Sequence, residues 1–300
     1  MKHGVEFHMG GGLFSHWLIL LENIRIWLAN SQISPTDELY INSIYKTAKN
    51  DFANGEYDKA KIENGLGFAT CNVFDHLLDQ NILNINRNIC TTAMHFSGRA
   101  SDVNHYKGVY TDEVFSKGFL KLNPNLMLKA DAFMAQHFKE NMLGVHVRMT
   151  DMNMYAIPHD SKPISYDDYC KKIEEVLKTE KIDKIFVASD NQESLNKLSE
   201  RFDICYHSFK NIASTESNCY HMTFTPLEHS ENMSNHTSWN KMPAKTFDEN
   251  IYVNAMIDAV LLANCHSFIG RKSALSYSSR FFPFCKLNKF HYLDKDAPRF

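Results

Sequence analysis

The stretch GVHVRMTD, residues 144–151, decides the predicted fold because it combines a buried strand with charged residues directly after it. Residues 143–147 are mostly apolar and rich in valine, which predicts a short internal strand. Arg148, Thr150 and Asp151 follow where this strand ends. Open α/β sheets bind ligands at the carboxyl ends of their strands. Since arginine stays charged and pairs with two phosphate oxygens at once, Arg148 is a candidate to bind a diphosphate.

The sequence around this stretch alternates between helix and strand patterns. Ser165 is a candidate N-cap, with Asp167 and Asp168 in the first turn of the helix that follows. Residues 182–188 have the continuous apolar character of a parallel strand covered on both faces. We expect helices at 121–140, 166–177, 192–202, 248–265 and 273–282, and strands at 143–147, 182–188 and 267–270. This order predicts α/β layers.

The N-terminal part resembles the opening of a Rossmann-like unit. A candidate strand at 5–9 is followed by Gly10, Gly11 and Gly12 and by a helix at 13–28. Ser15 stands where a third small residue is expected, so a tight turn without a ligand is the alternative. Residues 37–61 have a mixed composition and are expected at the surface, and the polar residues 205–239 predict a long loop.

A second candidate anion site is the turn at 270–273, between a predicted strand and a predicted helix. Free N–H groups at a helix start attract anions, and Arg271 and Lys272 add positive charge. A solvated turn that binds nothing is the alternative.

The composition limits the classes of function that the chain can have. The 300 residues are 44% hydrophobic and 22% charged, as in ordinary globular proteins, and suffice for one large or two medium domains. A net charge of -3 without a long basic run argues against nucleic acid as partner. The seven scattered cysteines form no C-x-x-C pair, which argues against a disulfide framework and favours a reducing compartment. The histidines at 207, 221, 229 and 236 lack the spacing of metal ligands, so we expect no metal site.

The sequence also bears on location. Residues 1–12 lack the apolar region of a secretory signal, and no run of 18 apolar residues predicts a membrane span. If Met1 begins the natural protein, we expect a soluble protein in the cytoplasm of a bacterium or of a virus-infected host. A trimmed chain is the alternative.

Three motifs, in this order along the chain, resemble those of the fucosyltransferase superfamily. That group includes nodulation and core α-1,6-fucosyltransferases and protein O-fucosyltransferases. Residues 144–151 resemble its His-x-Arg-Arg-Thr-Asp motif, and residues 184–191 (KIFVASDN) resemble its strand ending in Ala-Thr/Ser-Asp-Asp. Residues 258–276 resemble its Asp-x-x-x-Leu-Ser helix with a Ser-Ser turn. Residues 72–80 are similar to its Asn-x-Trp-Asp-x-x-x-x-Gln segment, with Phe74 in place of Trp.

The resemblance implies a GT-B fold, in which two Rossmann-like domains enclose a cleft. Residues 1–140 would form the acceptor side and residues 141–283 the donor domain, and the tail at 284–300 would cross back to the first domain. The implied reaction is an inverting, metal-independent glycosyl transfer, most simply of fucose from GDP-fucose to a glycan hydroxyl. It needs a nucleotide sugar and an oligosaccharide or glycan acceptor, and no further cofactor.

Residue roles follow from matching positions in the motifs. Arg148 matches the arginine that binds the donor phosphate, and His146 matches a histidine beside the nucleotide. Asp258 matches an acid that recognises the guanine edge, and Ser273 matches a phosphate-binding serine. The remaining matches are Gly11 and Gly12, in the loop near the donor, and Asp190, an acid that organises a strand end.

Two departures from the motifs leave the donor and the general base open. Met149 stands where many members have a second arginine, and Ala156 stands where α-1,6 members carry a glutamate proposed as the base. Asp151, His159 and Asp160 are the nearby candidates for the base. Another nucleotide sugar, such as a UDP- or GDP-linked pentose or hexose, and a non-catalytic nucleotide- or carbohydrate-binding relative are the alternatives.

Each candidate also has a structural interpretation. Arg148 is a possible ion-pair partner of Asp151 or Asp190, and His146 a hydrogen-bonded core histidine. Asp258 is costly to bury without a partner, so an N-cap or a salt bridge is its structural alternative.

Overall fold

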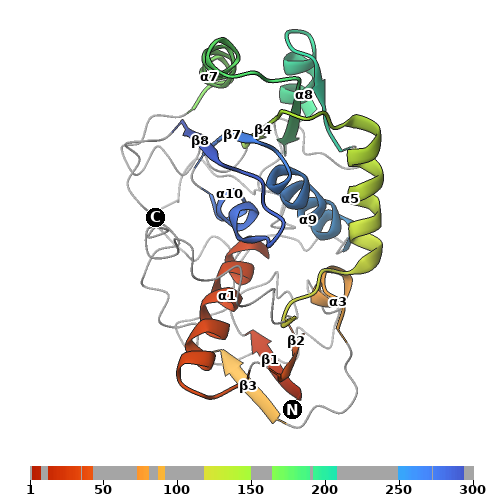
Figure 1. Ribbon diagram of the computed structural model, residues 1–300, viewed down its shortest axis with the longest axis vertical. Coiled ribbons are helices and arrows are strands. Elements are labelled where there is room, and N and C mark those ends of the chain that lie inside the picture. The colour runs from red at the N-terminus through yellow and green to blue at the C-terminus, as the bar shows by residue number, and fades with distance from the viewer. Residues whose placement is uncertain are drawn as a thin grey trace, which may run out of the picture.

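The strands in the described part of the chain form two parallel sheets. The computed structural model describes residues 2–7, 13–34, 36–42, 73–80, 87–91, 118–149, 164–189, 192–207, 249–271 and 273–293. In Figure 1, the three-stranded sheet and α1 lie at one end of the molecule and the five-stranded sheet, with α7 and α8, at the other. The predicted α/β class with parallel strands is confirmed.

The larger sheet has the strand order β6-β5-β4-β7-β8. Its strands are β4 (Met142–Val147), β5 (Lys184–Ser189), β6 (Ile204–Cys205), β7 (Ser267–Gly270) and β8 (Lys289–Tyr292). The helices between them are α7 (Tyr166–Thr179), α8 (Gln192–Ser199), α9 (Glu249–Ala263) and α10 (Ala274–Ser278), the last followed by the 3-10 turn η5 (Ser279–Phe281). All neighbouring strands are parallel, so their carboxyl ends meet at one edge.

The side chains of β4, β5 and β7 divide between the two faces of this sheet. Met142, Phe186 and Phe268 pack in the apolar cluster that contains α9. Val145, Val187 and Ile269 pack in the cluster that contains residues of α7 and α8. The period of two assigns Gly144 and His146 to the face covered by α9, together with Met142.

Helix α9 packs closely on β4 at Gly144. A Cβ atom at this position would lie 3.0 Å from Cδ2 of Leu262 and 3.1 Å from Cβ of Cys265. The helix is buried on nearly all sides, with Met256, Ile257 and Val260 shielded from solvent. A glycine in the strand therefore lets α9 approach the sheet.

The smaller sheet has the order β2-β1-β3, with β1 (Lys2–Phe7), β2 (Glu38–Asn42) and β3 (Arg87–Thr91). Helix α1 (Leu13–Ala29) follows β1, as the N-terminal pattern predicts, and buries the expected apolar side chains. The expectation that residues 37–61 lie at the surface is wrong for β2. Leu39, Tyr40 and Ile41 are buried, because the strand pairs with β1 and covers an apolar core.

Gln80, the last residue of the segment that resembles the family motif, has a structural role at the edge of β2. The side-chain oxygen of Gln80 accepts the N–H of Ile41 at 2.9 Å, and its amide nitrogen donates to the Ile41 carbonyl at 2.9 Å. The same nitrogen donates to Asp75 at 2.7 Å. Gln80 thus satisfies backbone groups of β2 that a further strand would otherwise bond.

One apolar cluster connects the elements around both sheets. The Trp17 ring of α1 stacks on Phe74 of α3 (Val73–Leu77), with centroids 6.3 Å apart, and lies 6.0 Å from the ring of Phe282 after η5. Residues of α5 (Pro124–His137) and α9 belong to the same cluster. Within the tail, Lys289–Tyr292 forms β8 beside β7. Phe282, just before the tail, packs on Trp17 of α1. Residues 294–300 lie outside the described residues, so the return of the tail to the first domain stays a prediction.

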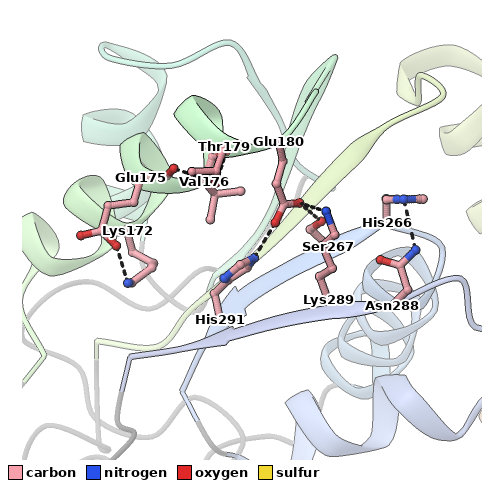
Figure 2. A network of polar contacts seen from close by, with 10 residues as sticks. All are labelled: Lys172, Glu175, Val176, Thr179, Glu180, His266, Ser267, Asn288, Lys289 and His291. Atoms are coloured by element: carbon pink, nitrogen blue, oxygen red, sulfur yellow. Dashed lines mark hydrogen bonds and ion pairs between the residues drawn. The ribbon is translucent and has the colours of Figure 1, made fainter.

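The carboxylate of Glu180 connects the C-terminal end of α7 to strands β7 and β8 of the larger sheet (Figure 2). Glu180 is the C-cap of α7, and its side chain accepts a hydrogen bond from Ser267 at the start of β7. In β8, His291 Nε2 lies 3.0 Å and Lys289 Nζ 3.5 Å from this carboxylate. Burial alone would raise the pKa of Glu180, but these partners outweigh it and hold the pKa below its ordinary value.

The variant Glu180→Gln tests this network. We expect it to lower the free energy of unfolding by about 1–3 kcal/mol at neutral pH, because Ser267 and Lys289 lose a charged acceptor. A lowered pKa stabilises the fold above the unfolded-state value of ~4.3, and this stabilisation is lost as pH falls through the folded pKa. Urea unfolding of both proteins at a series of pH values should therefore show the difference shrinking in acid. The exposed Glu175→Gln in the same helix is the control, and an equal loss there would contradict the prediction.

Candidate functional site

The candidate site lies at the carboxyl edge of the larger sheet, where β4 and β7 end side by side. His146 of β4 is in register with Gly270 of β7. A Cβ atom at Gly270 would lie 2.6 Å from the Phe268 ring and 3.3 Å from Cβ of His146, so only glycine fits between them without displacement. The chain then turns through Ser273, the N-cap of α10, whose hydroxyl accepts the N–H of Ser276 at 3.2 Å.

His146 and two serines form a buried polar cluster. The histidine is 5% exposed, and its Nδ1 lies 3.0 Å from the hydroxyl of Ser276 and 3.5 Å from that of Ser273. The two hydroxyls are 2.9 Å apart. His146 is thus a hydrogen-bonded buried histidine, as its structural interpretation predicts, and it is held at the strand end where a ligand would bind.

Arg148 is fixed through its backbone. It follows the last residue of β4, and its N–H donates to the hydroxyl of Tyr169 at 3.3 Å. Tyr169 is buried on α7. The Arg148 residue is half-buried, so the strand end is anchored while part of the residue stays accessible to solvent.

Asp258 is the most unusual group of the site. It lies in the tenth position of α9, is 4% exposed, and its Oδ1 has no hydrogen-bond partner within the described parts of the chain. Burial raises the pKa of this carboxyl group well above its ordinary value. An N-cap is excluded by its place in the helix, and no salt bridge to it occurs among the described residues.

The geometry of α9 places Asp258 beside the end of β4. Leu262 faces Gly144, and Asp258 lies four residues earlier, on the same side of the helix. Because α9 leads directly into β7, it runs antiparallel to the strands, and its earlier residues lie toward their carboxyl ends. Four helical residues span about 6 Å, and two strand residues span about 6.6 Å. We therefore expect Asp258 to lie close to the level of His146.

The structure thus brings three of the predicted residues, His146, Arg148 and Ser273, to one edge of the sheet, and it places Asp258 on α9, the helix that packs on β4. The other predicted site residues, namely Gly11, Gly12, Asp151, His159 and Asp190, lie outside the described residues, as does the alternative base Asp160.

The structure adds residues that the sequence analysis missed. The hydroxyl of Ser276 contacts His146, and the hydroxyl of Tyr169 accepts the backbone N–H of Arg148. The sequence signal for Ser276 was its position three residues after Ser273. Arg271 is 2% exposed, so the solvated-turn alternative is wrong for this residue. Within the described ranges, no group of three or more His, Cys, Asp or Glu side chains is arranged to hold a metal ion. Among the helices of the same ranges, none has the length and apolar character to cross a membrane.

The variant Asp258→Asn tests the state of the buried acid. An acid whose pKa is raised by folding destabilises the protein increasingly as pH rises from ~3.9, the unfolded value, toward the folded pKa. We expect the variant to gain Tm over the wild type progressively as the pH rises from about 4 toward the folded pKa, measured by calorimetry.

Asp183→Asn is the matched control with the opposite sign. Asp183 Oδ2 accepts the backbone and side-chain N–H groups of Asn141, each at 2.9 Å, and these bonds lower its pKa. That variant should lose Tm at neutral pH and approach the wild type in acid. An Asp258→Asn protein less stable than the wild type at the upper pH would contradict the assignment of an unpartnered acid.

Comparison with solved structures identifies the fold. The structure is similar to that of NodZ α-1,6-fucosyltransferase soaked with GDP-fucose, with a TM-score of 0.51, 15% identity and coverage of 99% of this chain and 97% of that chain. Fucosyltransferase NodZ from Bradyrhizobium gives a TM-score of 0.46 with 15% identity over 94% and 93% of the chains. POFUT1 in complex with GDP gives 0.49 with 10% identity over 98% of both chains.

Sequence comparisons add nothing to this likeness. No protein-family model matches the sequence, and no curated protein matches it. At this level of identity the structural likeness establishes the fold alone. The chain has the fold of that NodZ α-1,6-fucosyltransferase structure, a member of the group that its sequence motifs resemble.

Proposed function

We propose that this protein is an inverting, metal-independent glycosyltransferase that transfers a sugar from a nucleotide donor to a glycan hydroxyl. Fucose from GDP-fucose is the first donor to test, and no further cofactor is required. The observation that carries the proposal is Asp258 of α9, which is almost completely buried and whose Oδ1 has no hydrogen-bond partner among the described residues.

The site offers complementary groups to both ends of a guanosine diphosphate. The guanine edge presents two neighbouring N–H donors, and a carboxylate presents two acceptors. At the other end, the departing diphosphate gains negative charge, which cations and hydrogen-bond donors stabilise in the transition state. Arg148 would supply the cation, and the hydroxyl of Ser273 a donor.

The proposal also assigns one substrate to each part of the chain. Residues 141–283 would bind the donor in a GT-B arrangement, and residues 1–140 would bind the acceptor glycan across a cleft. The acceptor hydroxyl would attack the anomeric carbon from the side opposite the diphosphate, which inverts the configuration. A base among Asp151, His159 and Asp160 would accept the hydroxyl proton.

A second candidate function rests on Met149. This residue is half-buried and packs in the apolar cluster on the face of α7. An apolar side chain there removes one cation that many relatives of this motif have. This favours either a different nucleotide sugar or a protein that binds a nucleotide or carbohydrate without turnover.

Calorimetric binding of GDP and of UDP, each with and without Mg²⁺, separates these functions. Metal-independent GDP binding supports the proposed donor. A preference for UDP moves the donor to a UDP-sugar. Binding without transfer to any acceptor in a broad glycan panel supports the non-catalytic relative.

Arg148→Ala tests the phosphate-binding role. We expect transfer from GDP-fucose to fall by at least ~100-fold, because the leaving diphosphate loses its cation. Circular dichroism and Tm should stay close to the wild type. The control is Arg201→Ala, which removes an exposed arginine paired with Glu174 at the surface and should leave transfer unchanged. An Arg148→Ala enzyme with wild-type activity would refute the assignment.

A further inference from the structure

We propose that Asp258 is a neutral acid in the free protein and releases its proton when a guanine base binds, so that donor binding is coupled to proton release. The inference deepens the proposed function and depends on it, because it concerns the same site. It assigns to one residue both the recognition of the base and the pH dependence of binding.

The first argument is the cost of the free carboxylate. Asp258 is almost completely buried, and its Oδ1 has no partner in the described parts of the chain. An ionised carboxylate without hydrogen bonds is far more costly to bury than a neutral acid. The raised pKa of Asp258 agrees with this, and burial is its sole cause.

The second argument is the lack of compensating charge. Helix α9 packs against α3, α5, α10, η5, β4 and β5. The titratable or charged residues on these elements are Asp75, His76, Lys129, Asp131, His137, His146, Lys184, Tyr277 and Arg280, and α9 itself carries Glu249 and Tyr252. Among the described residues, none forms an ion pair or a hydrogen bond with Oδ1 of Asp258, and none shifts its pKa.

The third argument is the hydrogen-bonding pattern of the base. Guanine presents two adjacent N–H donors, which require two acceptors, so it binds the carboxylate and expels the proton. Uracil presents one N–H beside a carbonyl, which matches the C=O and O–H of a neutral acid. A guanine nucleotide therefore ionises Asp258, whereas a uracil nucleotide leaves its proton in place. The hydrogen bonds from guanine replace those that the free protein lacks.

The coupling predicts the sign of the pH dependence. When binding releases one proton, the affinity rises about tenfold for each pH unit while Asp258 is neutral in the free protein. The rise levels off once the free carboxyl group is ionised.

The experiment is calorimetric titration with GDP-fucose at one pH near neutrality, in buffers of different ionisation enthalpy such as phosphate and Tris. This ligand is chosen because its diphosphate is esterified at both ends and does not titrate near neutral pH. The slope of the observed enthalpy against the buffer ionisation enthalpy counts the protons released. We expect about one proton for the wild type, and none, with weaker binding, for Asp258→Asn. UDP-glucose is the second ligand, for which no proton release is expected if it binds.

The outcomes separate this inference from the proposed function. GDP-fucose binding without proton release overturns the inference alone. Release that persists in Asp258→Asn also overturns it, and assigns the proton to another group such as His146. Failure of the wild type to bind GDP-fucose at any pH overturns the proposed donor, and the inference with it. The number of protons that the wild type releases, and the change of its affinity with pH, test the inference even without the variant.

Discussion

The close approach of α9 to β4 is the constraint on which the site depends. Gly144 leaves room for Leu262 and Cys265 against the strand, and a larger residue there would push the helix away. Asp258 lies about one helical turn before Leu262. The contact of α9 with Gly144 therefore also influences how far the Asp258 carboxyl group lies from the sheet and where it lies along the strands. Packing in the core thus determines the position of a group at the edge of the sheet.

The apolar cluster around Trp17 likewise determines positions by packing, here those of whole helices. Helices α1, α3 and α9 and the segment after η5 all contribute to it, so the elements beside the smaller sheet are packed on those beside the larger one. The cluster contains large aromatic rings, which bury much area and resist displacement. The relative position of these helices is therefore determined by packing.

Two buried carboxyl groups show how the two ends of the larger sheet differ. Glu180, near the start of β7, has Ser267, His291 and Lys289 as partners, and its pKa is lowered. Asp258, on the helix α9 that packs on β4, has an oxygen without a partner among the described residues, and its pKa is raised. A satisfied carboxylate stabilises the fold, whereas an unsatisfied one costs stability and is typical of groups that serve a ligand. The physical contrast supports the proposal that the carboxyl edge of the sheet binds a ligand.

The sequence by itself determined the elements whose signals are local. The N-cap Ser165, the helix α9 and the valine-rich strand β4 each depend on residues a few positions apart, and all three are confirmed. The short strands β2, β3, β6 and β8 were missed, because too few residues carry a pattern and pairing with a neighbour defines them. Only the tertiary structure decided that His146 meets Ser276, 130 positions away, and that Oδ1 of Asp258 meets no partner among the described residues. Such contacts depend on how distant segments pack, which no local pattern encodes.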